Sequence, residues 1–231
     1  MEKNCESCGC REKCLYSYLR SEDKDILNQK KFFRQKKQGE TLYEQGFHAG
    51  SLYMINSGVV KMTKENRHGN PITISTAQCC TMTGLESLQT NAVYKSTAVC
   101  VTDVSFCIIP REGNVNLLKE NYKAREWFVA QYYQHMETLS NRVRDLMSGD
   151  VKMRIANAIW VLHRYYSSQK KCIEITREEL ADIAGTSRET VSRTLTALKT
   201  KKVLHVDGKC IRILKEDAIA KLAGIKMSEI G

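Results

Sequence analysis

The chain has 231 residues with 36 Lys and Arg against 26 Asp and Glu, which gives a formal net charge of +10. Apolar residues make up 42% of it, so it is not a disordered chain and it has enough material for one or two hydrophobic cores. Its first ten residues are charged and rich in cysteine where a signal peptide is apolar, and no uncharged apolar run approaches the roughly 18 residues that span a bilayer, so we expect a cytoplasmic protein with no membrane segment.

The first twenty residues form a cysteine-rich segment. Four of the ten cysteines lie here: Cys5, Cys8, Cys10 and Cys14. In a reducing compartment cysteines serve as metal or cluster ligands, as redox thiols or as small buried residues more often than as disulfides. We therefore expect ligands or redox thiols in this segment, and burial for the six cysteines scattered through the rest of the chain.

Residues 21–113 are predicted to be an antiparallel β-roll. Segments 51–55, 59–63 and 72–76 have the length of strands and are rich in Val, Ile, Thr or Tyr. Turn residues separate them, among them Gly58, because glycine adopts positive φ without strain. Short strands at this spacing indicate a sandwich or roll.

Residues 114–148 are predicted to be one long helix that pairs with a second copy of the chain. Apolar side chains recur at intervals of three and four residues, as in a coiled-coil seam. They are Val129, Tyr132, Met136, Leu139, Val143 and Leu146. A narrow seam over more than two heptads favours a homodimer, and the alternative is that the helix packs on its own domain.

Residues 149–231 are predicted to form a winged helix-turn-helix domain. Thr176 and Glu179 have the spacing of a capping box, and Gly185 suits a tight turn between two helices. Ser187 is a good N-cap for the second helix. Asp207 and Gly208 separate two short apolar runs, which predicts a terminal hairpin.

The second helix of this motif carries polar residues suited to reading DNA. Its opening residues are Arg188, Glu189, Ser192 and Arg193. Arginine pairs with guanine and glutamate accepts from cytosine in the major groove. Lys199, Lys201 and Lys202 follow, and we expect them to contact phosphates. The alternative is a helical hairpin with ordinary surface charges.

The whole chain resembles the CRP/FNR superfamily of bacterial transcription regulators. The stretch SRETVSR at 187–193 is close to the recognition-helix signature of the family, and residues 39–62 resemble the opening of its β-roll. The resemblance implies an α+β protein with an N-terminal β-roll, a dimerisation helix and a C-terminal winged helix-turn-helix. It further implies a dimeric regulator that binds a near-palindromic DNA site, contacts RNA polymerase and is not an enzyme. It assigns the reading of the half-site to Arg188, Glu189 and Arg193.

The resemblance extends to the cysteines. The spacing of Cys5, Cys8 and Cys14 is similar to that of the cluster ligands in oxygen-sensing FNR-type proteins, and Cys107 matches the place of their fourth ligand. This implies a [4Fe–4S] cluster that senses oxygen, redox state or nitric oxide. A tetrathiolate zinc site or a thiol–disulfide sensor would use the same residue type. Cys10 is surplus, with Cys10 in place of Cys8 or Cys14 as a ligand as the alternative.

Two other functions remain open from the sequence. In relatives that bind cyclic AMP, a glutamate and an Arg-Ser pair hold the nucleotide, whereas this chain has Leu85 and Lys95-Ser96 in the nearest segment. Cyclic nucleotides are therefore disfavoured, but a regulator with another small-molecule effector and structural or zinc-binding cysteines is an alternative. An iron–sulfur electron carrier is a second alternative. No catalytic constellation is visible, since the five histidines are scattered and no nucleotide-binding fingerprint occurs.

Overall fold

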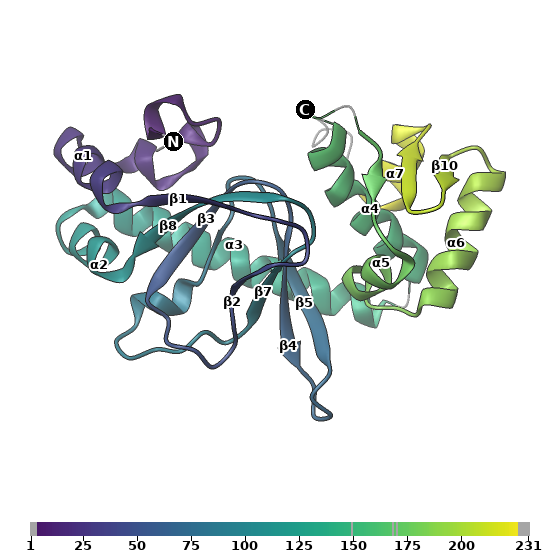
Figure 1. Ribbon diagram of the computed structural model, residues 1–231, viewed down its shortest axis with the longest axis horizontal. Coiled ribbons are helices and arrows are strands. Elements are labelled where there is room, and N and C mark those ends of the chain that lie inside the picture. Colours follow the sequence, from purple (N-terminus) through teal and green to yellow (C-terminus); the bar gives the residue numbers. More distant parts are fainter. Residues whose placement is uncertain (1–3, 149, 168, 170, 226–231) are drawn as a thin grey trace. The chain divides into compact units, whose positions relative to one another are not determined.

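The computed structural model describes residues 4–148, 150–167, 169 and 171–225 (Figure 1). The chain divides between Ser140 and Asn141 into two compact units. The outer ends of the first and last segments expected from the sequence, residues 1–3 and 226–231, lie outside the described residues, as does Gly149.

The first unit begins with short helical turns and one helix. These are η1 (Cys5–Ser7), η2 (Arg11–Lys13), η3 (Leu15–Tyr18) and α1 (Ser21–Lys30). The strands and one further turn follow: β1 (Phe32–Lys36), β2 (Thr41–Tyr43), β3 (Ser51–Ser57), β4 (Val60–Glu65), β5 (Pro71–Ala77), β6 (Met82–Thr83), η4 (Leu85–Leu88), β7 (Thr97–Cys100) and β8 (Val104–Pro110).

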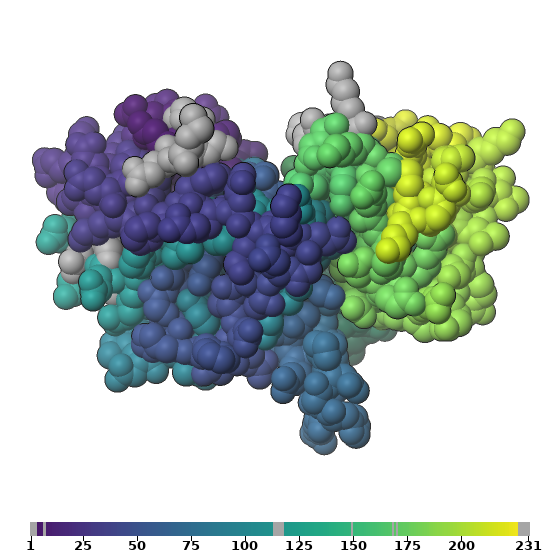
Figure 2. Space-filling model, viewed as in Figure 1, coloured from purple at the N-terminus to yellow at the C-terminus, as the bar shows by residue number. Residues whose placement is uncertain are grey.

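These strands form two four-stranded antiparallel sheets. Their orders are β1-β8-β3-β6 and β2-β7-β4-β5. The β4–β5 hairpin projects from the unit in both views (Figures 1 and 2). The predicted antiparallel roll is therefore confirmed.

The alternation of side chains along the central strands produces two separate cores. Tyr43, Ile55 and Phe106, from strands of both sheets, belong to the core between the sheets. On the opposite face of β3 and β8, Met54 and Cys107 belong to a second core. The cysteine-rich segment and the following helices cover that second face, so residue 107 faces the N-terminal cysteines because of strand periodicity.

Gly58 makes the turn from β3 to β4 possible. Its φ is +96°, and a Cβ at this position would lie 2.4 Å from the carbonyl oxygen of Asp103. Both the conformation and the close approach exclude a side chain here.

The stretch expected as one helix over 114–148 is two helices, α2 (Arg111–Glu120) and α3 (Tyr122–Met147). Asn121 separates them, and its side-chain oxygen accepts a hydrogen bond of 3.0 Å from the backbone N–H of Ala124. An asparagine in this position caps a new helix, which explains why apolar periodicity alone did not locate the break.

The second unit has the architecture of a winged helix. Its elements are α4 (Val151–Ser167), β9 (Ile173–Glu174), α5 (Arg177–Ala184), α6 (Arg188–Thr200), β10 (Leu204–Asp207), β11 (Cys210–Ile213) and α7 (Glu216–Leu222). The strands form an antiparallel sheet in the order β10-β11-β9. Ile159, Leu180 and Ile211 are fully buried between the helices and this sheet. None of the helices in the described part of the chain has the length and apolar character needed to cross a membrane.

Four of the six scattered cysteines depart from the expectation of burial as thiols, namely Cys172, Cys210, Cys79 and the partly buried Cys80. Cys172 and Cys210 form a disulfide with a Cα–Cα distance of 5.6 Å, which links the residue before β9 to β11. Cys79 is exposed. The spacing of the cysteines in the sequence does not predict this disulfide, because the sheet of the second unit brings together two residues that are 38 positions apart.

Candidate DNA interface and cysteine site

The helix-turn-helix of the second unit is built by the caps expected from the sequence. The hydroxyl of Thr176 accepts from the N–H of Glu179 at 3.1 Å, and the Glu179 carboxylate accepts from the N–H of Thr176 at 2.9 Å. Helix α5 ends at Gly185, which has φ +63°. A Cβ on Gly185 would lie 3.0 Å from atoms of Arg142 and Leu146, so the turn requires glycine for its conformation and for its packing.

A buried arginine supports the same turn, and sequence reasoning missed it. Arg154 of α4 donates to the carbonyls of Ala184 at 2.9 Å and Gly185 at 3.2 Å. It also donates to the carbonyl of Asp145 at 3.1 Å. The bonds to Ala184 and Gly185 satisfy carbonyls at the end of α5, and the bond to Asp145 reaches the last turns of α3. Arg154 stands in an amphipathic helix with other basic residues, so no local signal distinguishes it.

Helix α6 presents the predicted reading residues on its surface. Val191, Leu195 and Leu198 are buried, whereas Arg188, Glu189 and Arg193 are exposed and Ser192 is partly exposed. Ser187 caps the helix, since its hydroxyl accepts from the N–H of Thr190 at 3.3 Å. Figure 1 shows α6 on the outside of its unit, next to β10.

The charged groups at the start of α6 have partners within the motif. Arg188 forms an ion pair with Glu178 of α5 at 3.0 Å, and Arg193 donates to the hydroxyl of Thr190 at 3.3 Å. A hydrogen bond from the backbone N–H of Glu189 itself, together with the Ser187 hydroxyl, lowers the pKa of the Glu189 carboxyl. Glu189 is therefore favoured as a carboxylate, which can accept a hydrogen bond but not donate one.

The predicted phosphate-binding lysines fall into two groups. Lys201 and Lys202 are exposed at the end of α6. The ammonium of Lys199 donates to the carbonyl of Val206 on β10 at 3.0 Å. Lys199 thus ties the recognition helix to the wing.

The four predicted cluster ligands, Cys5, Cys8, Cys14 and Cys107, line one cavity of about 30 Å³, and Cys10 lines it too. Met54 and Ile109 belong to its apolar wall. Three of the sulfurs come from the cysteine-rich segment and the fourth comes from β8, where Cys107 pairs with Phe33 on one side and Met54 on the other. The fold therefore brings together residues that are 93 to 102 positions apart, counting from Cys14 and from Cys5 to Cys107.

Burial and one cation shift the pKa values of three of these thiols, Cys5, Cys14 and Cys107. Desolvation raises the pKa of Cys5 and Cys107, and it raises the pKa of Cys14 to about 11. The buried ammonium of Lys31 donates to the sulfur of Cys5 at 2.8 Å and opposes the shift at that residue. A cation beside several sulfurs stabilises a negatively charged metal–thiolate group. The apolar wall, the four soft ligands and Lys31 thus fit an iron–sulfur cluster.

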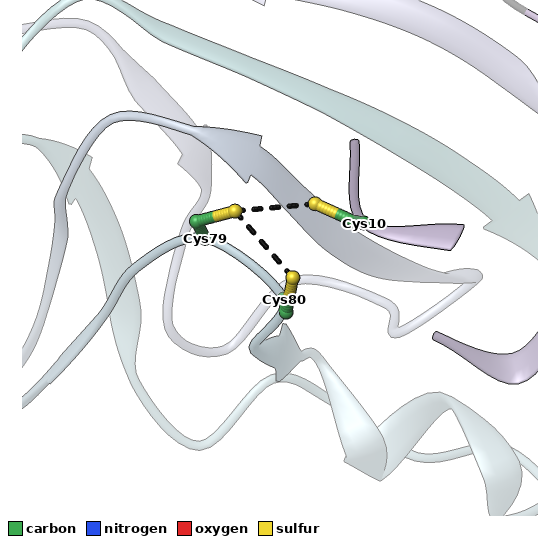
Figure 3. Close-up of side chains that lie close together, drawn as sticks. All are labelled: Cys10, Cys79 and Cys80. Carbon is green, nitrogen blue, oxygen red and sulfur yellow. Dashed lines mark hydrogen bonds between the residues drawn. The ribbon is translucent and has the colours of Figure 1, made fainter. Parts of the chain in front are cut away.

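The closest group of sulfurs is a different one. Among the residues that the structure describes, the three potential ligands whose sulfurs all lie within 4.8 Å of one another are Cys10, Cys79 and Cys80 (Figure 3). The sequence offered Cys10 as a surplus cysteine that could replace Cys8 or Cys14 as a cluster ligand. Sequence reasoning missed Cys79 and Cys80 as partners, because their place in a turn between two strands gives no spacing signal.

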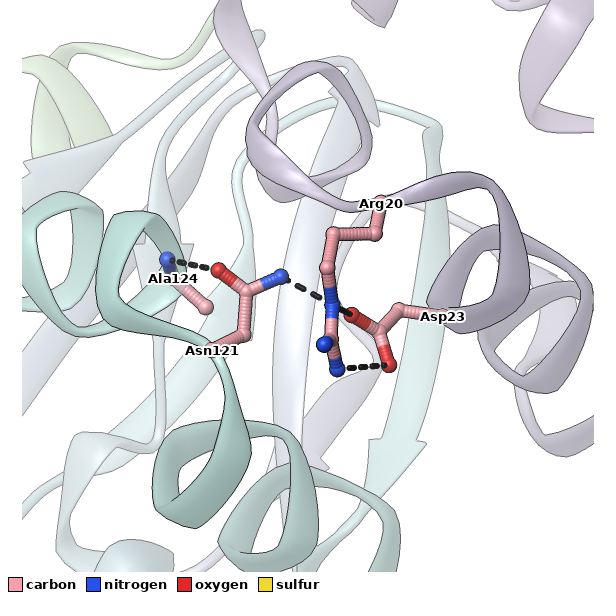
Figure 4. Close-up of polar contacts among 4 residues, drawn as sticks. All are labelled: Arg20, Asp23, Asn121 and Ala124. Carbon is pink, nitrogen blue, oxygen red and sulfur yellow. Dashed lines mark hydrogen bonds and ion pairs between the residues drawn. The ribbon is translucent and has the colours of Figure 1, made fainter.

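Polar contacts connect the helix after the cysteine-rich segment to the start of α3 (Figure 4). The buried carboxylate of Asp23 in α1 accepts from the guanidinium of Arg20 at 2.9 Å and from the amide of Asn121 at 2.9 Å. The hydrogen bond from Arg20 lowers the pKa of Asp23. Asn121 in turn caps α3 through Ala124, so one side chain contacts both helices.

The exposure of the apolar side chains differs along the predicted dimer seam on α3. Val129 is 68% exposed, Met136 62% and Val143 55%, a degree of exposure unusual for apolar side chains. Tyr132 and Leu139 instead face the roll, and the hydroxyl of Tyr132 donates to the carbonyl of Leu85 at 3.2 Å. The last member of the seam, Leu146, is 45% exposed.

A larger cavity lies within the first unit, between the roll and α3. Its volume is about 270 Å³, and its lining includes Glu86, Lys95, Ser96 and His135. Leu85 is buried and contributes no acidic group, while the backbone N–H of Lys95 donates to the Glu86 carboxylate at 3.1 Å. Desolvation lowers the pKa of His135.

Comparisons with known proteins agree with this architecture. The family profile described as a cyclic nucleotide-binding domain matches residues 33–121, and that of a Crp-like helix-turn-helix domain matches residues 153–222. The chain is 27% identical to the transcriptional activator protein Anr of Pseudomonas aeruginosa, over 96% of this chain and 93% of the relative. It is 24% identical to the fumarate and nitrate reduction regulatory protein of Escherichia coli, over 96% of this chain and 90% of that protein.

A further relative and two solved structures complete the comparison. A CRP-like cAMP-activated global transcriptional regulator of Mycobacterium tuberculosis is 24% identical over 80% of this chain and 85% of its own length. A transcriptional regulator of the crp/fnr family from Eubacterium rectale superposes with a TM-score of 0.71 at 17% identity, covering 91% of this chain and 97% of that one. FixK2 from Bradyrhizobium japonicum superposes with a TM-score of 0.69 at 17% identity, covering 83% of this chain and 96% of that one. The two structures share the fold.

Proposed function

The chain belongs to the CRP/FNR family of transcription regulators, which are not enzymes, and on this premise we propose that it reports oxygen, redox state or nitric oxide through a [4Fe–4S] cluster. The observation that carries the proposal is the single apolar cavity lined by Cys5, Cys8, Cys14 and Cys107. A regulator acts where the DNA is, so a cytoplasmic location is part of the proposal. The relatives are regulators of transcription, which argues against the alternative function of an iron–sulfur electron carrier.

We assign the reading of DNA to α6. Arg188, Glu189 and Arg193 lie on its exposed face and have the hydrogen-bonding groups for base edges in the major groove. Lys201 and Lys202 are placed for phosphates, which position the protein without selecting a sequence. A homodimer would present two such helices about one DNA turn apart, roughly 34 Å, and so would select a near-palindromic site. RNA polymerase is the further partner that this role requires.

We assign the holding of the cluster to the four cavity cysteines. The bound group would supply reversible oxidation and sensitivity to oxygen, which no side chain of this chain offers. Met54 and Ile109 limit the access of water, and Lys31 offsets negative charge beside Cys5. Cys107 lies on β8, which is paired on both sides in its sheet, whereas Cys5 lies in η1 and Cys8 and Cys14 flank the short helical turns. We therefore assign the fixed side of the site to the sheet.

The same core connects the cysteines to the dimer helix. Cys5, Cys14 and Cys107 share a buried cluster with Trp127 and Phe128 of α3. Loss of the cluster would free the cysteine-rich segment and loosen this packing together with the contact between Asp23 and Asn121. A difference of a few kcal/mol between two packings is enough to alter DNA affinity, since about 1.4 kcal/mol corresponds to a factor of ten.

The test is the iron and sulfide content of anaerobically purified protein, with DNA binding measured before and after exposure to air. We expect one cluster per chain in the wild type, and air-dependent loss of both the cluster and DNA affinity. Cys107→Ser should lose the iron, whereas Cys100→Ser, at a buried cysteine in β7 outside the cavity, should retain it. Full iron content in Cys107→Ser, or zinc in place of iron with DNA binding indifferent to air, would contradict the sensor assignment and leave the DNA-binding role intact.

The cavity of about 270 Å³ favours a second candidate, a regulator with a small-molecule effector. The match to a cyclic nucleotide-binding domain and the name of the M. tuberculosis relative point the same way. Leu85 and Lys95 lack the carboxylate and the bidentate guanidinium that hold a cyclic nucleotide. Adding cyclic AMP to the Cys107→Ser variant distinguishes the two candidates, because restored DNA binding would support an effector site in the roll.

A further inference from the structure

Three sulfurs outside the predicted ligand set converge on one point. The sulfur of Cys10 lies 3.2 Å from that of Cys79, which lies 3.4 Å from that of Cys80 (Figure 3). Cys10 belongs to the cysteine-rich segment, while Cys79 and Cys80 belong to the turn between β5 and β6. We call these three residues the thiol triad. Cys10 also lines the cavity of the four predicted cluster ligands, whereas Cys79 and Cys80 do not.

The backbone of the turn creates this arrangement. Neighbouring residues of an extended chain point to opposite sides, but Cys80 has φ +65°, a conformation that non-glycine residues rarely adopt. The N–H of Cys80 donates to the carbonyl of Ile55 at 2.9 Å, and that of Thr81 donates to the carbonyl of Gln78 at 2.9 Å. The left-handed residue turns the sulfurs of two consecutive cysteines toward each other.

Cys10 is held against the same part of the roll. Its sulfur donates to the carbonyls of Asn56 at 3.5 Å and Ile55 at 3.9 Å. Its side chain is only 3% exposed, so the cysteine-rich segment places this sulfur beneath the surface rather than in solvent. Two segments some 70 residues apart thus present thiols to one another.

We propose that the thiol triad binds a single soft metal ion, separate from the cluster site. Sulfurs that share one ion at a metal–sulfur distance of about 2.3 Å lie about 4 Å apart. The observed separations of 3.2 and 3.4 Å require only small side-chain rotations to reach that geometry. Three sulfur ligands select thiophilic ions such as Zn²⁺ or Cu(I) over hard ions such as Mg²⁺.

The surroundings of the triad suit such an ion. Cys79 is exposed, which gives an ion a route from solvent and leaves room for a water molecule to complete a four-coordinate zinc site. Each thiol would release its proton to solvent on binding. Three thiolates on Zn²⁺ carry one net negative charge, and the positive charge of Lys13 acts on Cys80 from nearby.

Binding at the triad would fasten the cysteine-rich segment to the roll. Cys10 lies between Cys8 and Cys14, two of the predicted cluster ligands, and an ion would join it to residues 79 and 80. The triad would therefore limit how far the segment moves when that cavity loses its cluster.

The test uses the full chain with the cluster site disabled by Cys5→Ser and Cys107→Ser. The reduced, anaerobic protein is titrated with Zn²⁺ in one arm and with Cu(I) in the other, and bound metal per chain is measured after desalting. We expect one ion per chain in at least one arm. Adding Cys79→Ser should weaken that binding by more than about tenfold, since even changes beside a metal site cost 10- to 100-fold. Adding Cys100→Ser should leave it unchanged.

A second measurement, limited proteolysis, tests whether metal binding holds the cysteine-rich segment against the roll. Arg11 and Lys13 are exposed between Cys10 and Cys14, so trypsin cleavage there should slow when the metal binds and should not slow in the Cys79→Ser protein. No bound metal in either arm, equal binding with and without Cys79, or a Cys10–Cys79 disulfide in the reduced protein would overturn the proposal.

The wild-type background separates this proposal from the cluster assignment. Cys79→Ser should retain its full iron content there, whereas Cys107→Ser should lose iron and still bind the added ion at the triad. Because Cys79 is exposed, its replacement by serine should not disturb folding, which circular dichroism checks.

Discussion

The guanidinium of Arg193 reaches from the exposed face of α6, where Thr190 of the same helix accepts a hydrogen bond from it at 3.3 Å. If it reads a base, Arg193→Ala should weaken binding to the specific site by about 1–3 kcal/mol and change binding to random DNA little. Lys201→Ala is the comparison: it should weaken both equally and reduce the slope of log affinity against log salt by about one. Anisotropy titrations on both sequences over a range of salt measure both effects. Equal losses for Arg193→Ala on the two sequences would identify it as a phosphate contact.

At the scale of elements, α3 leaves an apolar stripe uncovered in the single chain, most completely at Val129 and Met136. If this stripe is the dimer interface, Met136→Asp would place two carboxylates in a desolvated contact across the two-fold axis. We expect monomers at micromolar concentration and a large loss of binding to the palindromic site, measured by sedimentation and by titration. Gln134→Asp, on an exposed side chain off the stripe, introduces the same charge and should remain dimeric. A dimeric Met136→Asp protein would place the interface elsewhere.

At the scale of the whole molecule, the proposed sensor requires that a signal at the cysteines reach α3, the proposed dimer helix. Asn121 contacts Asp23 and caps α3, so Asn121→Ala removes both bonds and leaves a buried carboxylate with one fewer donor, at a cost of about 1–3 kcal/mol. We expect the cluster content to stay at the wild-type level while the difference in DNA affinity between anaerobic and aerated protein shrinks. Asn157→Ala, at an exposed position in α4, serves as the matched control. An unchanged response to air would show that the signal does not depend on this contact.

Local patterns in the sequence determined much of the fold. The length of segments 51–55 and 72–76 and their content of Val, Ile, Thr or Tyr identified strands, because these residue types suit the pleated surface of a sheet. The capping box at Thr176 and Glu179 and the glycine at 185 identified the helix-turn-helix, because caps and turns depend on residues within one or two helical turns. The family followed from the same local motifs, and the comparisons confirm it.

The tertiary structure decided what depends on residues far apart in the chain. The contact of Asn121 with Asp23, the disulfide between Cys172 and Cys210 and the thiol triad all require neighbours that no local pattern specifies. The cavity of four cysteines was predicted only in part. A family resemblance named its four cysteines, and the tertiary structure shows that they line one cavity. The physical reason is common to all of them. Backbone propensities and caps act over a few residues, whereas the packing of one sheet face against a distant segment selects which side chains meet.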